Sequence, residues 1–345
     1  MPGEPVRKAI VARAFCTRAV DSDAAFRFKQ PKSRPFCHTN PRRTAVSDTG
    51  KPALGFIGLG LMGSAMVERL QSLGYPMTVR GHRNRTPIEA AVARGASEAA
   101  SPKALAAASD IVMFCVDTSA SVEANVFGEE GVLAGLKPGA VLVDFGTSLP
   151  GSTKRIGAAA AEIGAQMMDA PLGRTPSHGR EGKLNIMAGG DKSLFDRLKP
   201  VLDDLGENVF HVGPLGAGNT LKLINNFFAM TTAVAMSEAF AMADKAGLDR
   251  ATLYAVMSAG PLKSGMMDFV KANAIDGVKD MLAFSIANAR KDIGYYGLMA
   301  DELDAPTLMS PATKQALGLA KAEGWGTRMV PEMVDFIAGL YGRKG

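Results

Sequence analysis

Cysteine is scarce in this chain, with 3 residues in 345. An odd number cannot form a complete disulfide framework, and the sequence has no C-x-x-C or H-E-x-x-H spacing. We therefore expect no disulfide scaffold, no metal site and a reducing compartment, the cytoplasm. Long uncharged apolar runs are also lacking. The apolar stretch 221–243 contains Lys222 and Glu238, so it predicts a core helix and not a membrane span.

Acidic residues are scarce in residues 1–52, which hold 11 Lys and Arg against 4 Asp and Glu. The rest of the chain holds 28 against 30, so the basic character belongs to this segment and no nucleic-acid partner is expected. The segment has no sustained apolar period, which predicts disorder. Three explanations stay open for it: an organelle transit peptide, a basic arm that binds nucleic acid or acidic partners, or translation that starts near Val46, which we favour.

A glycine motif follows the first apolar run, 54–57, and precedes a helical pattern that ends near Leu73. G-x-G-x-x-G between a strand and a helix is typical of a dinucleotide site. The first glycine permits the tight turn, the second lets the backbone approach a pyrophosphate, and the third allows close packing of helix on strand. The phosphates would lie at the helix N-terminus. The cofactor residues expected here are Gly58, Leu59, Gly60, Leu61, Met62 and Gly63.

No acidic residue follows the second expected strand, 76–80. An NAD-specific domain usually has Asp or Glu at this point for the ribose hydroxyls. Guanidinium groups suit a 2′-phosphate instead, so NADP is favoured and NAD stays open. The alternative is a solvated basic loop. The residues expected to bind the 2′-phosphate are Arg83, Asn84, Arg85 and Thr86.

Continuous apolar runs at 110–116 and 140–144 alternate with Ala-rich helical segments, which indicates a doubly wound parallel sheet. Thr147 follows the carboxyl end of such a strand, where these sheets bind ligands, although it could equally cap the helix beginning near Pro150. After the long apolar helix the pattern stays helical. We therefore expect a basic extension over 1–52, a Rossmann-type NAD(P)-binding domain over 53–213 and an all-α substrate and oligomerisation domain over 214–345.

Lys222, Asn225 and Asn226 are spaced i, i+3 and i+4, so they share one face near the start of the long helix. A lysine on an apolar helix is costly to bury unless it is paired or functional. Desolvation lowers a lysine's pKa and lets it exchange protons near neutral pH. Reduction of an aldehyde needs one such donor for the developing alkoxide. The alternative is a lysine that extends from the helix end into solvent.

Together these motifs resemble the β-hydroxyacid dehydrogenase family over roughly residues 53–340. The resemblance implies an α/β protein with a Rossmann-type doubly wound parallel sheet followed by an all-α C-terminal domain, and dimers or tetramers. It implies that Lys222 is the catalytic acid/base and that Asn226 orients the substrate. It also places Val116, Thr147 and Lys291 at the cofactor. The motifs that carry it lie at 55–66, 144–150, 169–190 and 213–226, with a weaker one at 284–292.

Two motifs depart from the family's pattern. The common D-x-S-T is D-F-G-T here, with Gly146 in place of serine, and the S-G-G anion loop is Gly173, Arg174 and Thr175. This form resembles the 3-sulfolactaldehyde reductase branch, in which the loop binds a sulfonate. The arginine fork could equally hold the carboxylate of a semialdehyde, or form an ion pair with a residue such as Asp169.

The sequence therefore predicts an NAD(P)-dependent oxidoreductase that interconverts a small anionic aldehyde and its alcohol. Lys222 and Asn226 would be catalytic, and Gly173, Arg174, Thr175 and Asn225 would bind the substrate. A reductase of the succinic semialdehyde, glyoxylate or 3-hydroxyisobutyrate type is the alternative. A non-catalytic NADP-binding interaction protein is the alternative of another class.

Overall fold

The computed structural model describes residues 50–81 and 84–342. The predicted strands form the centre of one sheet, in which β1 pairs with β2 and β4 in parallel, and β5 and β6 continue the parallel order. The full order is β3-β2-β1-β4-β5-β6-β8-β7, with β9 on β8. The strands are β1 (Leu54–Ile57), β2 (Met77–Arg80), β3 (Ser97–Glu98), β4 (Ile111–Phe114), β5 (Val141–Asp144), β6 (Gln166–Asp169), β7 (Leu172–Gly173), β8 (Leu184–Gly189) and β9 (Gly206–Gly213).

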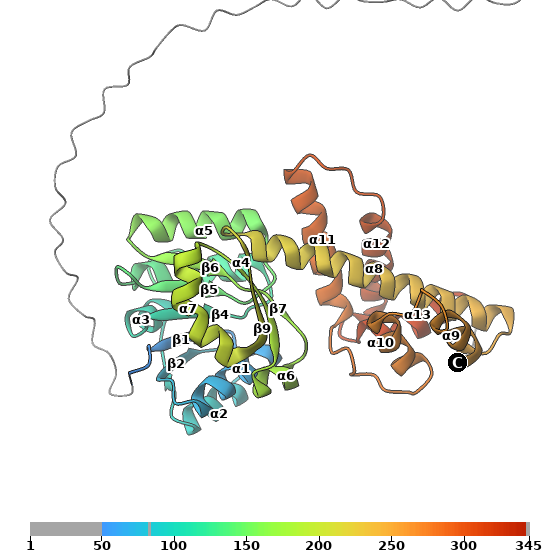
Figure 1. The fold of residues 1–345 in the computed structure, drawn as a ribbon, viewed down its shortest axis with the longest axis horizontal. Helices are drawn as coiled ribbons and strands as arrows, with labels where there is room; N and C mark the ends of the chain where they lie inside the picture. The colour runs from blue at the N-terminus through green and yellow to red at the C-terminus, as the bar shows by residue number, and fades with distance from the viewer. Residues whose placement is uncertain (1–49, 82–83, 343–345) are drawn as a thin grey trace, which may run out of the picture. The chain divides into compact units, whose positions relative to one another are not determined.

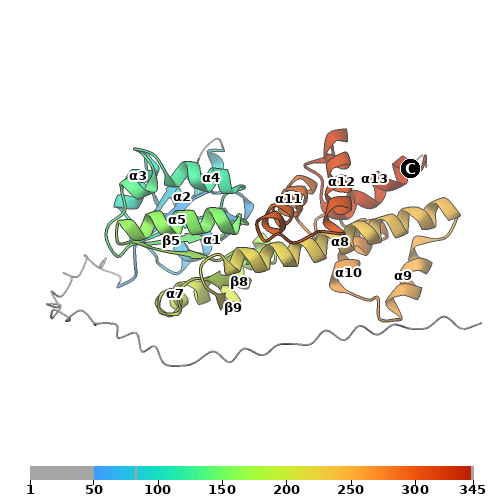
Figure 2. The ribbon, with the colours of Figure 1, turned by 90° about the horizontal axis from the view of Figure 1, so that it is seen from above.

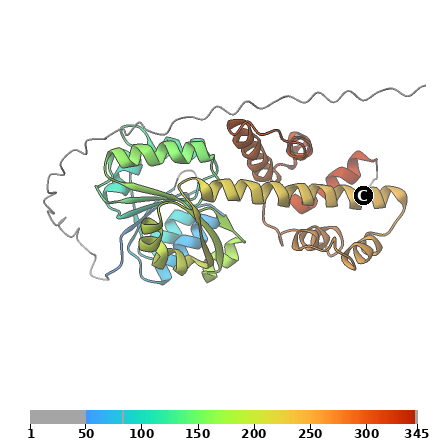
Figure 3. The same ribbon diagram turned by 45° about the horizontal axis from the view of Figure 1, so that its top comes forward.

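Helices cover both faces of this sheet, which is why its central strands are apolar without alternation. Phe56 packs into the apolar cluster that α1 and α7 cover, and its neighbour Ile57 packs into the cluster under α5. In Figure 3, α1 and α5 lie on opposite sides of the sheet. These helices are α1 (Leu61–Ser72), α2 (Thr86–Ala93), α3 (Pro102–Ala107), α4 (Ser119–Val126), α5 (Pro150–Glu162), α6 (Pro176–Glu181) and α7 (Lys192–Leu205).

The part of the chain after β9 is helical and has its own apolar cluster, centred on Phe240 and Val334. It begins with α8 (Ala217–Ala246), a helix of 30 residues that starts beside the sheet and continues among the C-terminal helices, as Figures 1 and 2 show. These helices are α9 (Arg250–Ser258), α10 (Gly265–Ala274), α11 (Ile286–Glu302), α12 (Ser310–Ala320) and α13 (Met333–Leu340).

The expected fold class is confirmed: a mostly parallel Rossmann-type sheet is followed by an all-helical region. The sequence did not predict β7, β8 and β9, which extend the sheet beyond β6. In this extension β8 is antiparallel to β6 and β7 and parallel to β9. None of the helices among the described residues has the length and apolar character needed to cross a membrane. The expectation of disorder falls on residues 1–52, most of which lie outside the described residues.

Candidate active site

The glycine loop between β1 and α1 has the geometry of a phosphate cradle. Gly58 has φ +101°, and a Cβ added there would lie 2.4 Å from the carbonyl oxygen of Cys115. A Cβ on Gly63 would lie 2.0 Å from the carbonyl oxygen of Gly58, whereas one on Gly60 meets no atom within 4 Å. The first and third glycines are thus required by packing, and the second faces space that a cofactor's pyrophosphate can use.

The start of α1 also suits an anion. Gly60 caps the helix with no side-chain hydrogen bond, and the first turn has no acidic residue, so its N–H groups and the helix dipole favour a bound phosphate. Val116 belongs to the same place, because its Cγ1 would be 2.7 Å from a Cβ on Gly58. The residues present therefore fit a dinucleotide, with the backbone from Gly58 to Gly63 holding its phosphates.

The basic residues after β2 are partly engaged by the protein itself. Arg85 donates two hydrogen bonds to the Glu98 carboxylate, at 2.7 and 2.8 Å, and this contact raises the pKa of the guanidinium. The Asn84 side chain accepts a hydrogen bond from the backbone of Thr86. Arg83 lies outside the described residues. The role of these four residues at a 2′-phosphate stays a prediction.

The loop after β5 is ordered by Asp144, which is buried. Its carboxylate accepts hydrogen bonds from the Gly146 N–H at 2.8 Å and from the Ser148 hydroxyl at 2.7 Å. Burial raises the pKa of Asp144, and these two hydrogen bonds act against that increase. A Cβ at position 146 would lie 3.0 Å from Asp144 Oδ1 and from the carbonyl oxygen of Val116, so glycine fits this turn closely. These contacts fix the loop that carries Thr147, directly after β5.

Lys222, Asn225 and Asn226 lie together in the first turns of α8, as their spacing predicted. Lys222 is half-buried, and burial lowers the pKa of its ammonium group. The negative charge of Asp292 raises this pKa, and the positive charge of Lys291 lowers it. A lowered pKa makes Lys222 a stronger proton donor than an exposed lysine.

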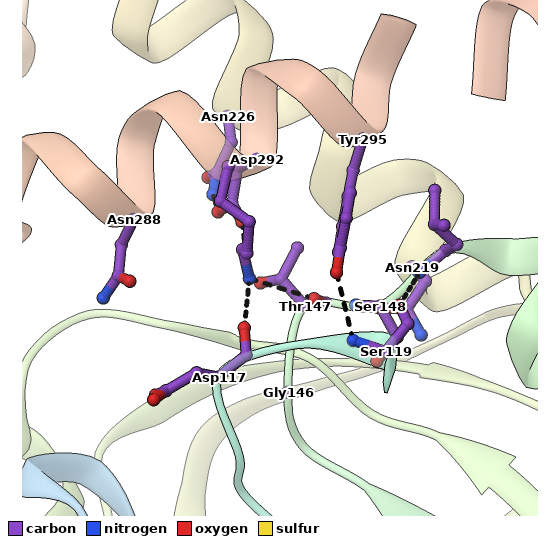
Figure 4. Close-up of polar contacts among 12 residues, drawn as sticks. Asp117, Ser119, Gly146, Thr147, Ser148, Asn219, Asn226, Asn288, Asp292 and Tyr295 are labelled. Atoms are coloured by element: carbon purple, nitrogen blue, oxygen red, sulfur yellow. Dashed lines mark hydrogen bonds and ion pairs between the residues drawn. The ribbon is translucent and has the colours of Figure 1, made fainter. Parts of the chain in front are cut away.

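Asn226 is connected to α11 through Asp292, as Figure 4 shows. Asn225 donates a hydrogen bond to the Asn226 side-chain oxygen, and Asn226 Nδ2 donates to Asp292 Oδ2 at 2.6 Å. The other oxygen of Asp292 lies 2.9 Å from Lys291 Nζ. Since Asp292 is only 2% exposed, its charge is screened little by water and orients both partners strongly.

Lys291 joins α11 to the loops at the carboxyl edge of the sheet. Its Nζ donates to the carbonyl oxygens of Asp117 at 2.8 Å and of Thr147 at 3.2 Å. One helical turn further on, the Tyr295 hydroxyl accepts a hydrogen bond from the Ser119 N–H. Figure 4 shows the Tyr295 side chain pointing from α11 towards Ser119. The structure thus brings Lys291, Thr147, Lys222 and Asn226 into one polar region.

The start of α8 is held against the sheet by Asp169, which the sequence did not mark as a site residue. Its carboxylate accepts from the N–H groups of Gly216 at 2.7 Å and Asn219 at 2.6 Å. The Asn219 side chain in turn accepts from the Ser148 N–H and donates to Thr153. Burial raises the pKa of Asp169 to about 6. Asp144 and Asp169 each end an apolar strand, and that position was the signal available in the sequence.

Arg174 is not free for a substrate in this structure. Its backbone has φ 76°, and its guanidinium donates to the Glu207 carboxylate and to the Lys183 carbonyl oxygen. The ion-pair alternative is therefore what the structure shows, but the expected partner was wrong, because Asp169 binds the α8 backbone. Gly173 pairs with Asn185 in β7, and Thr175 Oγ1 lies 2.7 Å from His178 Nδ1. The role of all three loop residues at the substrate stays a prediction.

Two family models match the chain. The NAD-binding domain of 6-phosphogluconate dehydrogenase matches residues 53–213, and the NAD-binding region of NADP-dependent 3-hydroxyisobutyrate dehydrogenase matches residues 216–337. Among solved structures, a Mycobacterium tuberculosis 3-hydroxyisobutyrate dehydrogenase with L-serine is similar in fold, with TM-score 0.75 and 23% identity over 83% of this chain and 99% of that one.

Two curated relatives have higher identity. A probable 3-hydroxyisobutyrate dehydrogenase-like protein of Arabidopsis thaliana, named as mitochondrial, is 33% identical over 296 residues, or 86% of this chain and 96% of the relative. The 3-sulfolactaldehyde reductase of Escherichia coli is 30% identical over 291 residues, or 84% of this chain and 97% of the relative.

The fold, the dinucleotide loop and these similarities define an NAD(P)-dependent oxidoreductase, a dehydrogenase or reductase that acts on hydroxy acids. Within that class the chain belongs to the β-hydroxyacid dehydrogenase family.

Proposed function

We propose that this enzyme interconverts a small anionic aldehyde and its alcohol, with Lys222 as the acid/base. The observation that supports this best is the placement of Lys222. It is a half-buried lysine with a lowered pKa, next to the chain of Asn226, Asp292 and Lys291, at the carboxyl edge of a dinucleotide-binding sheet. That edge is where doubly wound sheets bind their ligands.

The cofactor supplies or accepts the hydride at the substrate carbon when it is bound. The residues that would hold it are those of the glycine loop, with Val116 and Thr147 beside its nicotinamide end and Lys291 fixing the two loops that carry them. We propose NADP as the preferred cofactor, with the basic residues after β2 at its 2′-phosphate and NAD as the alternative. Titrating the protein with NADPH and NADH by fluorescence tests this, and tighter binding of NADH would contradict it.

Lys222 would donate its proton to the carbonyl oxygen as negative charge develops there during reduction. In the reverse direction the neutral amine would take the hydroxyl proton. Asn226, held by Asp292 through its amide nitrogen, would set the angle of the reacting oxygen, and Asn225 would extend this polar surface. A positioned acid/base group of this kind contributes about 10²–10⁴-fold to a rate.

The substrate class we propose is an aldehyde with a sulfonate or carboxylate, bound by Gly173, Arg174 and Thr175. For this, Arg174 must exchange Glu207 for the substrate, which is feasible because the pair is partly exposed and such pairs are worth about 0–1 kcal/mol. Arg174→Gln should raise the KM for an anionic aldehyde and change kcat little. An unchanged KM would show that Arg174 binds Glu207 and not the substrate.

The experiment that tests the function is cofactor oxidation by the purified protein. NADPH and NADH are each offered with 3-sulfolactaldehyde, succinic semialdehyde, glyoxylate and tartronate semialdehyde. Preference for the sulfonate supports the sulfolactaldehyde-like assignment, and preference for a carboxylate supports the semialdehyde alternative. Bound cofactor with no turnover of any aldehyde would contradict the proposal.

We also propose a homodimer or homotetramer in the cytoplasm. The supporting observation for assembly is an apolar stripe on α8, where Ile224 is 46% and Phe228 is 73% exposed. Light scattering on the purified protein tests the assembly, and a monomer at micromolar concentration would contradict it.

Cell fractionation tests the compartment, and recovery in an organelle would favour a transit peptide instead.

A further inference from the structure

A groove of about 490 Å³ opens beside Lys291, between α11, the following helix α12 and the loop after β4. Lys222, Asn225 and Asn226 are not among the residues that line it. Four of its lining side chains are cationic: Arg290, Lys291, Lys314 and Lys321. Asp117 is the one acidic residue among the described residues that line it. The groove therefore has a strong excess of positive charge.

The other three cationic side chains of the groove, those of Arg290, Lys314 and Lys321, each pass close to a glycine. A Cβ on Gly318 would lie 3.2 Å from Arg290 Nε, and a Cβ on Gly294 would lie 3.7 Å from Lys314 Cε. The stem of Lys321 passes Gly326 in the same way, at 3.2 Å. Small residues at these points let the long side chains lie across the surface of the helices.

These three cations also form no ion pair within the part of the chain that the structure describes. Many other surface cations do: Lys199 lies 2.6 Å from Asp203, and Lys271 lies 2.6 Å from Asp276. Like charges that line one groove repel one another, and an anion in the groove would relieve that repulsion. A guanidinium with flanking ammonium groups suits an oxyanion with more than one charge, such as a phosphate.

We propose that this groove binds a multiply charged oxyanion carried by a small molecule. Lys291 connects the groove to the reaction site, because it lines the groove while it holds the loops of Asp117 and Thr147. The anion has two sources that share this chemistry: the distal group of a phosphorylated aldehyde substrate, or a separate effector. The first source rests on the proposed function, whereas binding of the anion itself does not.

The first test is calorimetric titration of the protein, saturated with NADP⁺, with inorganic pyrophosphate as the probe. Saturation fills the phosphate sites of the cofactor, so added anion reports on another site. The variant R290Q/K314Q/K321Q removes three charges and keeps part of each stem. The matched control K137Q/K263Q/K279Q removes three exposed charges that have no ion pair among the described residues and lie outside the groove.

We expect the groove variant to bind pyrophosphate at least about tenfold more weakly, and the control to bind it as the wild type does. The wild-type affinity should also fall as salt is raised. Absence of binding to the wild type, or equal binding to both variants, would overturn the proposal. This arm needs no turnover, so it stands even if the proposed aldehyde chemistry fails.

The second test identifies the source by kinetics with glyceraldehyde 3-phosphate and 3-sulfolactaldehyde, which share a three-carbon hydroxyaldehyde and differ in the distal group, a doubly charged phosphate ester against a singly charged sulfonate. If the substrate supplies the anion, the groove variant loses kcat/KM for the phosphate by about tenfold and keeps it for the sulfonate. If an effector supplies it, added pyrophosphate changes turnover of both aldehydes in the wild type and of neither in the variant. Pyrophosphate binding without either effect, in an enzyme that does turn over these aldehydes, marks an adventitious ion only and overturns the proposal.

Discussion

The substitution Asp292→Asn removes one negative charge from the centre of the site and leaves the size of the side chain almost unchanged. The wild-type carboxylate lies 2.9 Å from Lys291 Nζ and accepts from Asn226 Nδ2 at 2.6 Å. An asparagine in its place puts its own amide donor against one of these two donors. If the new donor faces Asn226, the Asn226 amide has to rotate; if it faces Lys291, Asn226 keeps its acceptor and Lys291 loses its charge partner.

The size of the effect follows from the burial of the pair. Asp292 is 2% exposed and the Lys291 side chain is 20% exposed, so water has little access to this ion pair. Removing one partner of a buried ion pair costs about 3–5 kcal/mol. Lys291 keeps its two carbonyl acceptors, on Asp117 and Thr147, which places the expected loss of unfolding free energy at the low end, about 3 kcal/mol.

The same change alters the acid/base group. Asp292 raises the pKa of Lys222 against the effects of burial and of Lys291, so its neutralisation lowers that pKa further. Reduction needs the protonated lysine, and kcat for aldehyde reduction should therefore begin to decline at a lower pH than in the wild type.

The assays are urea denaturation and the pH dependence of kcat. Asp276→Asn is the control, because it breaks the exposed pair with Lys271 and should cost less than about 1 kcal/mol without moving the pH profile. A decline of kcat at unchanged or higher pH in D292N would refute the electrostatic coupling. A loss of unfolding free energy no larger than that of the control would refute the claim that the buried Lys291–Asp292 pair contributes strongly to stability.

Two further predictions concern the glycine loop and the anchor of α8. Gly60→Ala should keep the folding stability, because its Cβ meets no protein atom, and should weaken NADPH binding, because the Cβ enters the space proposed for the pyrophosphate. Gly63→Ala should lower the unfolding free energy by about 1–3 kcal/mol, because its Cβ clashes with the Gly58 carbonyl oxygen. An NADPH affinity in G60A equal to that of the wild type would contradict this assignment. The pKa of Asp169, raised to about 6, means that the folded state takes up a proton before the unfolded state does. The unfolding free energy of the wild type relative to Asp169→Asn should therefore rise as pH falls from about 6 towards about 4, and a fall over that range in urea denaturation would contradict the buried carboxylate.

Much of the fold could be predicted because its signals are local. The run at Leu54–Ile57 is apolar on both faces because helices cover both faces of the strand, and the glycine spacing directly after it is typical of a dinucleotide loop. Lys222 and Asn226 come together through helical spacing alone. By contrast, β7 has two residues and β8 pairs with strands on both sides, so their order depends on tertiary contacts that no local pattern carries.

The parts of the site that sequence analysis missed or misjudged depend on contacts between distant residues. Asp169 reaches Asn219, 50 positions later, and Asn219 in turn accepts from the N–H of Ser148, 71 positions earlier. Arg174 is paired with Glu207, on a strand that was not predicted. A long exposed side chain has several partners within reach, and its choice is set by the packing of the elements that carry it.

The most direct test of the account is single-turnover reduction by Lys222→Ala with NADPH already bound. We expect NADPH to bind as in the wild type and hydride transfer to the best aldehyde to slow by about 10²–10⁴-fold. Hydride transfer at the wild-type rate would contradict the role of Lys222 as the proton donor.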